Sequence, residues 1–481
     1  MKVDNLEDIY ALSSMQKGML FHTLFAPQSG IYLNQSAWII KGELNLAAFQ
    51  WAWQQVINRH TALRTAFFWE DLDEPLQVVQ RQVELPLTQL DWRGVAPEIQ
   101  EDQFATLLAS DLAQGFQLSE APLMRLALIR TADTTYRFCW SRHHLLLDGW
   151  SQVIVLKDMF TLYEVYCYGE QIGFDETAVL GKRRSYGDYI GWLQEQDGSK
   201  AEHFWRELLI SWPGPAALKL AAPTPRQAGH TYHSQEHRLS DSVTGQLQTL
   251  LQQQQLTMNT LIQGAWACML GYYSGQADVV FGVTVSGRPA DLPEIESMVG
   301  LLINTLPMRA QLADDQLLLP WLKTLQAQQL EMLQYEYSSL VDIQGWSKVP
   351  REQSLFETVV VFENYPMNTA TFTQHSSLQV SLLRTFIQNS MPLTVRAIPG
   401  QELTLDILYD SERFSSATIS RVLREFDHVL QAIAEHPNIR LGDLQALLLA
   451  ADQQFQLSEA QRLRDANSQK LKTTRRRSVV S

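Results

Sequence analysis

Cysteine is scarce in this sequence, with 3 among 481 residues. Cys139, Cys167 and Cys268 lie far apart without metal-ligand spacing, so they provide neither a disulfide framework nor a cysteine-based metal site. We expect all three to be packing residues, and we expect no metal in the protein. So few cysteines suit a reducing compartment, and the predicted location is therefore cytoplasmic.

Long apolar runs and excess positive charge are also missing. No run approaches the roughly 18–20 apolar residues that cross a bilayer, and the mixed charges of residues 1–8 do not resemble a secretory signal. The formal net charge is −14, whereas general binding to nucleic acid or anionic lipid needs a basic surface. We therefore expect no membrane partner and no nucleic-acid partner.

Hydrophobic periodicity predicts an α/β protein. Residues 135–143 alternate as a two-faced strand does, and apolar residues recur three or four apart over 153–163 as on a helix, with Ser151 as the expected N-cap. Further helices are predicted around 247–251 and 261–269, and further strands at 279–283, 357–362 and 403–409. Alternating strands and helices imply sheets covered by helices.

The length of the chain favours two lobes and a tail. We place the N-terminal lobe at residues 1–180 and the C-terminal lobe at 181–458. Residues 459–481 are polar and end in a basic stretch without apolar periodicity, so we expect them to form a disordered tail or a linker.

The segment with the clearest chemistry is residues 142–151, RHHLLLDGWS. A neutral imidazole with a pKa near 7 accepts a proton from an attacking amine or hydroxyl, so either His143 or His144 could be a general base. Asp148 could orient that ring or pair with an arginine. Gly149 could let its N–H approach a substrate carbonyl or an oxyanion, and Trp150 would line the cavity.

Spacing alone leaves a second interpretation open. A His followed four residues later by Asp arises often by chance, and a histidine among apolar neighbours is more often a hydrogen-bonded core residue than a catalyst. On the same reasoning, Arg59, Arg64 and Arg288 would be solvated surface charges.

The extended motif resembles the active-site motif of condensation domains of nonribosomal peptide synthetases, which are relatives of chloramphenicol acetyltransferase. Other segments resemble further motifs of this family in the same order along the chain, from about residue 6 to 455. They are residues 12–22 (LSSMQKGMLFH), 59–67 (RHTALRTAF), 186–192 (YGDYIGW), 299–305 (VGLLINT), and 350–351 with 354–356.

The resemblance implies two chloramphenicol-acetyltransferase-like lobes arranged as a V-shaped pseudodimer, with a tunnel between them that donor and acceptor carrier proteins enter from opposite faces. It implies an acyltransferase that joins a donor thioester to an amine, or to a hydroxyl, both carried on phosphopantetheine arms. No cofactor would be bound intrinsically. His144 would orient or deprotonate the acceptor, with Asp148 mainly structural.

The expected site residues fall into two groups. The catalytic group is His144, His143, Asp148 and Gly149. A second group would line the tunnel or support it structurally: Trp150, Ser151, Arg59, Arg64, Arg288 and Asn304.

The sequence contains no Gly-rich phosphate loop, adenylation signature or carrier serine motif. Donor and acceptor carriers must therefore be partner proteins or other parts of a longer polypeptide. The intact His pair and the Gly149-Trp150-Ser151 run disfavour the heterocyclisation and epimerisation subtypes. Residues 15–22 and 361–366 look closer to members that accept a D-configured donor residue.

Two alternatives remain open at this point. One is a catalytically silent module that recruits a tailoring enzyme to a carrier-bound peptide, although the motif of such members is usually degraded. The other is a freestanding acyltransferase that uses soluble coenzyme A thioesters.

Overall fold

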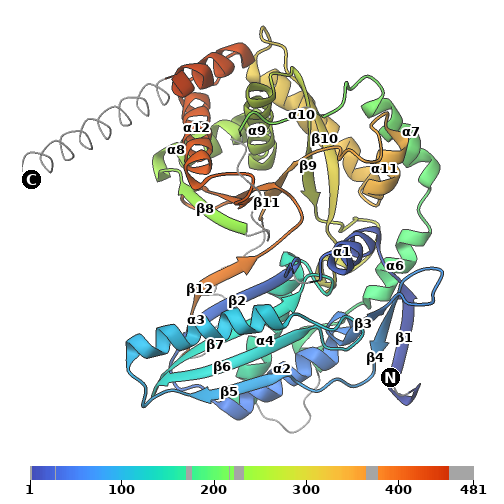
Figure 1. Cartoon of the computed structure of the whole chain (residues 1–481), viewed down its shortest axis with the longest axis vertical. Helices are drawn as coiled ribbons and strands as arrows, with labels where there is room; N and C mark the ends of the chain where they lie inside the picture. Colours follow the sequence, from blue (N-terminus) through green and yellow to red (C-terminus); the bar gives the residue numbers. More distant parts are fainter. Residues whose placement is uncertain are drawn as a thin grey trace, which may run out of the picture.

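A computed structural model describes residues 3–27, 29–168, 176–215, 217–220, 232–364 and 378–453. The predicted tail, 459–481, and residues 365–366 of the segment compared with D-accepting members lie outside this part of the chain. Figure 1 shows two lobes, one built mainly from the first part of the sequence and the other from the second. The mixed α/β architecture predicted from periodicity is confirmed.

The N-terminal lobe contains a five-stranded sheet in the order β12-β2-β7-β6-β5. Its strands are β2 (Leu33–Lys41), β5 (Leu87–Asp91), β6 (Met124–Ala132), β7 (Thr135–His143) and β12 (Gln379–Ile387). β7 pairs antiparallel with both β2 and β6 over nearly its whole length, which makes it the central strand. The two-faced strand predicted at 135–143 is therefore confirmed.

Helices cover both faces of this sheet (Figure 1). The helix α3 (Pro97–Gln114) packs Phe104 and Leu108 on one face, against Ala37, Ile129 and Cys139. On the other face, α2 (Leu46–Arg59) and α4 (Gly149–Tyr168) enclose the main core of the lobe. The apolar residues of β7 on that face enter this core, and α4 begins at Gly149, shortly after β7 ends at His143.

A smaller sheet, β1-β4-β3, flanks this lobe. Its strands are β1 (Leu6–Ala11), β3 (Thr65–Phe68) and β4 (Leu76–Gln80), and the helix α1 (Ser14–Phe25) follows β1 directly. A capping box between Ser13 and Gln16 begins α1. Short 3₁₀ turns lie at η1 (Val3–Asn5) and η2 (Thr61–Arg64).

The C-terminal lobe contains a six-stranded sheet in the order β10-β9-β11-β13-β14-β8. Its strands are β8 (Tyr232–Arg238), β9 (Asp278–Val285), β10 (Asn304–Gln311), β11 (Thr358–Phe362), β13 (Leu393–Ile398) and β14 (Thr404–Asp410). The strands predicted around 279–283, 357–362 and 403–409 are thus present, each shifted by no more than two residues.

The helix α5 (Glu176–Leu180) ends at the predicted lobe boundary, and Leu180 packs against the core of the N-terminal lobe. The helices of the C-terminal half are α6 (Tyr186–Gln194), α7 (Gly198–Leu209), α8 (Asp241–Gln254), α9 (Met258–Ser274), α10 (Leu318–Met332), α11 (Leu340–Trp346), α12 (Ser416–Glu435) and a helical stretch at 441–453. Short 3₁₀ turns occur at η3 (Ile295–Ser297) and η4 (Leu333–Tyr335). Trp266 of α9 packs against Phe426 of α12 within the core of the lobe. The two helices predicted around 247–251 and 261–269 are α8 and α9.

One strand crosses between the lobes. In the sequence, β12 (Gln379–Ile387) falls between β11 and β13, which both belong to the C-terminal sheet. It nevertheless pairs antiparallel with β2 of the N-terminal sheet. The chain then returns at once to β13 (Figure 1). The lobe boundary at residues 180/181 stays a prediction. β12 belongs by sequence to the C-terminal lobe, 181–458, but completes the sheet of the N-terminal lobe.

Candidate active site

The candidate site lies on the loop between β7 and α4, residues 144–148. Leu145, Leu146 and Leu147 are at most 2% exposed and belong to the core of the N-terminal lobe. Gln16, from the first of the family-like motifs, donates a hydrogen bond from Nε2 to the carbonyl of Leu145 (3.1 Å). Three buried leucines in a row hold the loop rigidly, so the polar residues at its two ends have fixed positions.

His144 has one ring nitrogen committed to a backbone carbonyl. Its Nδ1 lies 3.0 Å from the carbonyl oxygen of Leu147. A carbonyl can only accept, so Nδ1 carries the proton and Nε2 carries the lone pair. Burial, followed by the nearby Arg142 cation, lowers the pKa of His144 below its usual value. At neutral pH His144 is therefore an uncharged base with its lone pair on Nε2.

His143 adopts the opposite tautomer and is enclosed. Its Nδ1 accepts the N–H of Leu145 (3.2 Å), and its Nε2 lies 3.4 Å from the hydroxyl oxygen of Thr23. That hydroxyl donates to the carbonyl of Met19, so it accepts from His143. Burial, with a contribution from His144, lowers the pKa of His143 to about 3. With 2% of its surface exposed, His143 supports the loop.

The backbone of His144 is fixed by an unusual residue that the sequence motifs do not identify. Its N–H donates to the carbonyl of Tyr32 (2.8 Å), and Tyr32 has a positive φ of 62°, a conformation rarely adopted by a bulky residue. The Tyr32 hydroxyl donates to Ser390 (2.8 Å) and lies 2.8 Å from Nδ1 of His22. No sequence signal marks a tyrosine for such a conformation.

Asp148 faces away from the imidazole and towards the C-terminal half. Its carboxylate receives both Nη atoms of Arg288, at 3.1 and 3.2 Å, and the N–H of Leu302 at 3.1 Å. The side chain of Asp148 is completely buried and that of Arg288 is 4% exposed. Of the two roles considered for Asp148, the structure shows the arginine pair.

The helix α4 begins differently from the prediction. It starts at Gly149, and Asp148 Oδ1 accepts the N–H of Ser151 (2.8 Å), so the expected N-cap Ser151 is wrong by three positions. An aspartate at the N-cap satisfies a free N–H and favours the positive end of the helix. The hydroxyl of Ser151 instead donates to the carbonyl of Gly300 (2.9 Å) and accepts the Gly300 N–H (3.1 Å).

The residues around the start of α4 differ in their exposure and contacts. Trp150 is half-buried, and its indole N–H donates to the carbonyl of Glu296 (3.0 Å), while the Arg288 guanidinium lies 5.4 Å from its ring centre. Gly149 is half-buried as the first residue of α4. Both therefore lie beside the Asp148 to Arg288 pair.

Arg59 and Arg64 are buried but make their contacts elsewhere. Arg59 bonds to Asp158 of α4 (3.2 Å) and to the carbonyl of Gly181 (3.0 Å). Arg64 pairs with Glu7 and donates to the carbonyl of Ile57 (3.0 Å). The interpretation of these arginines, and of Arg288, as solvated charges is wrong, because each is tied to an acidic side chain that folding brings close.

Asn304 also makes its contacts away from the histidine loop. Its side-chain amide donates to the carbonyls of Glu336 (2.8 Å) and Ser338 (2.7 Å), which fastens β10 to the segment after α10. The loop 144–148 is thus assembled with Arg288, Gly300 and Leu302 from the C-terminal half, whereas Arg59, Arg64 and Asn304 brace the surrounding fold.

Two broader properties of the described ranges bear on the site. No group of three or more His, Cys, Asp or Glu residues within them has an arrangement that could hold a metal ion. No helix among them is long and apolar enough to cross a membrane.

Comparison with known proteins adds a family and a fold. A family model described as Condensation domain matches residues 6–456. A linear gramicidin synthase of Brevibacillus parabrevis is 44% identical over 442 residues, which cover 92% of this chain and 6% of that protein. Bacitracin synthase 3 of Bacillus licheniformis is 31% identical over 446 residues, which cover 92% of this chain and 7% of that protein. The chain therefore spans only a small part of such relatives.

Solved structures share the fold at low sequence identity. A four-domain nonribosomal peptide synthetase, holo-AB3403, aligns with a TM-score of 0.77 and 19% identity, over 91% of this chain and 34% of that one. The first condensation domain of the calcium-dependent antibiotic synthetase aligns with a TM-score of 0.74 and 16% identity, over 91% and 99%. The two-lobe fold implied by the motif resemblance is confirmed.

Proposed function

Because the chain belongs to the Condensation domain family, we propose that it joins an acyl or peptidyl thioester on one carrier protein to an amine on a second carrier protein, with His144 acting on the amine. Condensation domains are acyltransferases that form amide bonds in nonribosomal peptide synthesis. The carriers, the phosphopantetheine arms and the tunnel between the lobes are parts of this proposal. The protein would need no cofactor of its own.

The observation that carries the proposal is the state of His144. Its Nδ1–H is bound to the Leu147 carbonyl and its burial lowers its pKa, so a neutral imidazole presents a lone pair on Nε2. Such a group can orient an amine or accept its proton. His143 is ruled out of that role in the proposal, because Leu145 and Thr23 occupy both of its ring nitrogens.

In the proposed reaction the amine nitrogen attacks the thioester carbonyl carbon, and a C–N bond forms. Nε2 of His144 accepts the proton that the nitrogen loses. The C–S bond then breaks, the electron pair stays on sulfur, and the proton from His144 restores the free thiol of the donor arm. Gly149, at the N-terminus of α4, would allow close approach of the carbonyl, where N–H dipoles favour a developing negative charge.

Asp148 has a supporting role in this proposal. Its carboxylate is engaged by Arg288, Leu302 and Ser151, and it therefore holds the loop in place against the C-terminal half. Arg59, Arg64 and Asn304 would act indirectly, by stabilising the surrounding fold. Trp150 and Ser151 would line the site beside Arg288.

The test uses two carrier proteins, each loaded with its substrate before mixing, and detects the product on the acceptor carrier by intact-protein mass spectrometry. Product should form with the wild type and nearly vanish with His144→Ala. The same donor offered as a coenzyme A thioester should react far more slowly. Equal reaction from coenzyme A would favour the freestanding acyltransferase, and absence of product from every loaded pair would favour the silent recruitment module.

A negative control tests the need for partners. The purified chain, incubated with free amino acids and ATP, should give no peptide, because activation and carriage would be done by other proteins. Product formed from those components alone would contradict the proposed function.

A further inference from the structure

Glu336 is a buried acid outside every motif identified in the sequence. It lies between η4 and α11 and is 6% exposed. Its Oε2 accepts the backbone N–H of Gly287 (3.2 Å). Its own carbonyl is fixed by the side-chain amide of Asn304 (2.8 Å). A buried carboxyl is costly unless hydrogen bonds or charges compensate its loss of water. The hydrogen bond from Gly287 therefore stabilises both the buried Glu336 side chain and the turn that contains Gly287.

Gly287 and Arg288 form a turn that is pressed against the segment 300–302. Gly287 has a φ of +59°, and a Cβ at this position would lie 1.7 Å from the carbonyl oxygen of Leu302. The neighbouring Arg288 holds Asp148 with both Nη atoms, and the N–H of Leu302 donates to the same carboxylate. Any shift of this turn would therefore move two of the groups that hold Asp148.

We propose that Glu336 is a positioning residue for condensation. By holding the Gly287–Arg288 turn, it fixes the hydrogen bonds that Arg288 and Leu302 make to Asp148. Those bonds in turn set the placement of His144 at the other end of the loop. This inference rests on the proposed function. It assigns a task to a buried carboxyl that would otherwise be unexplained, and it extends the support of His144 to a distant segment of the C-terminal half.

The charges around Glu336 come from several elements. Arg288 lowers the pKa of Glu336 and Asp291 raises it. Glu336 and Asp148 both raise the pKa of Tyr189 on α6. Burial is the largest influence and raises the pKa of Glu336 to about 7. The ionised carboxylate is the stronger acceptor for the Gly287 N–H, so the turn is held most firmly above that pH.

This predicts two separate limbs in the dependence of turnover on pH. One limb belongs to His144, whose lowered pKa places it below about 6.5. The other belongs to Glu336 near pH 7, and turnover should rise with pH through both. Glutamine at position 336 keeps an acceptor for the Gly287 N–H but cannot titrate, so it should remove the upper limb and leave the lower one.

The experiment measures turnover with preloaded carriers from about pH 5 to about pH 9, together with KM for the acceptor carrier and the melting temperature. It compares the wild type with Glu336→Ala, Glu336→Gln and the control Glu402→Gln, which neutralises an exposed acid on the turn between β13 and β14. Glu336→Ala should lower kcat by roughly 10- to 100-fold with KM unchanged, as small misplacements of a catalytic group do. Glu336→Gln, a neutral acceptor like the protonated glutamic acid, should give a kcat between those of Glu336→Ala and the ionised wild type, without the upper limb.

Arg288→Lys supplies a second measurement. The double variant Arg288→Lys with Glu336→Ala should lower kcat by no more than the more severe single variant does, because both changes act through Asp148. Glu336→Ala with wild-type kcat, or an upper limb that persists in Glu336→Gln, would overturn the inference even if the alanine variant melts early. A wild type without condensation activity would instead overturn the proposed function, and the inference with it.

Discussion

The two ends of the loop 144–148 are held by different halves of the molecule. At the first end, His144 is anchored within the N-terminal lobe by Tyr32 and Leu147 and keeps its lone pair on Nε2. At the second end, Asp148 is completely buried and is held by Arg288 and Leu302 from the C-terminal half. Three buried leucines separate the two ends. One short loop therefore holds the residue proposed for chemistry at one end and the attachment between the lobes at the other.

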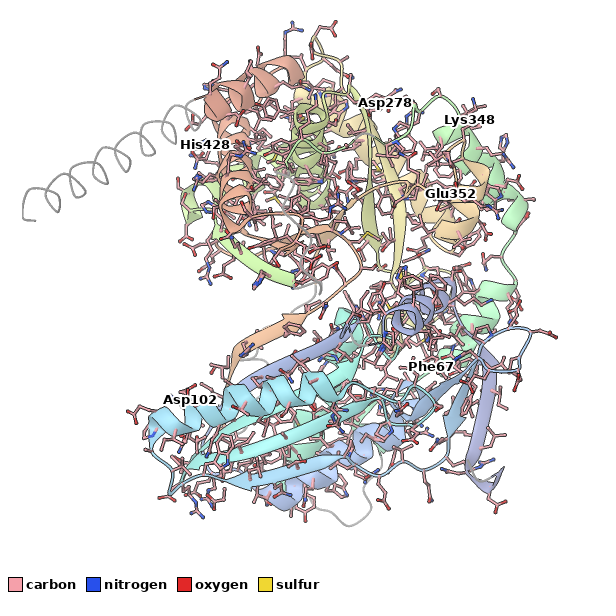
Figure 2. The ribbon with its side chains drawn as sticks, in the orientation of Figure 1. Phe67, Asp102, Asp278, Lys348, Glu352 and His428 are labelled. Carbon is pink, nitrogen blue, oxygen red and sulfur yellow. The ribbon has the colours of Figure 1, made fainter. Side chains whose placement is uncertain are left out.

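Figure 2 shows where the two lobes meet. Side chains fill the region where α1 and the adjoining strands meet the upper lobe, near the labelled Phe67, whereas Asp102 and Asp278 mark parts of the two lobes that lie far from each other. The lobes therefore meet over part of their facing surfaces. The buried ion pair at Asp148 joins the two halves, so its loss should lower stability and also disturb the placement of His144 at the other end of the loop.

The largest effect on chemistry is expected from His144→Ala. Removing a positioned proton acceptor typically lowers the rate by about 10²- to 10⁴-fold, while the melting temperature should hardly change because no buried charge loses its partner. Carrier-to-carrier transfer and thermal unfolding are measured on the same preparation. His203→Ala is the control, since the His203 side chain is 77% exposed and pairs with Glu207 on the surface. Near-normal turnover of His144→Ala would contradict the chemical role proposed for this end of the loop.

The largest effect on stability is expected from Asp148→Ala. Leaving Arg288 buried without its partner should cost about 3–5 kcal/mol, so the variant should melt early or stay insoluble. Arg288→Ala should behave in the same way. Asp133→Ala, which breaks an exposed pair with Arg93, should cost at most about 1 kcal/mol. If Asp148→Ala keeps wild-type stability but loses turnover, Asp148 belongs to the chemistry and the separation is wrong.

A smaller effect is expected from Tyr32→Phe, which tests the anchoring of His144. The change removes the hydroxyl bonds to Ser390 and His22, each worth about 1 kcal/mol, and leaves the ring in place. Turnover should fall several-fold, with a loss of stability of about 1–2 kcal/mol. Tyr168→Phe, at the exposed end of α4, serves as the matched control. Unchanged turnover would show that the hydroxyl does not help to hold His144.

The smallest effect is expected from deletion of residues 466–481. The basic, aperiodic sequence of this segment predicts no contribution to either core, so neither turnover nor the melting temperature should change. Differential scanning calorimetry of the truncated chain checks this. A drop of many degrees would mean that the tail packs on a lobe, and the stability comparison would then have to include it.

Local patterns predict the elements around the site but not their joining. The strand at 135–143 follows from alternation, because successive side chains of a strand point to opposite faces. The start of α4 does not follow, because Asp and Ser are both good N-caps and only the folded backbone shows which one is used. The position of β12 beside β2 cannot be predicted either, since period-2 alternation says nothing about which strand will be the neighbour.

The sequence by itself determined the family, the α/β class and the segment proposed to carry the chemistry, because these depend on motifs of residues adjacent in the chain. Even the histidine tautomer depends on a carbonyl only three residues away. The tertiary structure alone decided what holds that segment. Arg288 and Asp148 are 140 positions apart, and Gly287 and Glu336 are 49 apart. Contacts over such separations are set by how strands and lobes pack, and no local periodicity encodes them.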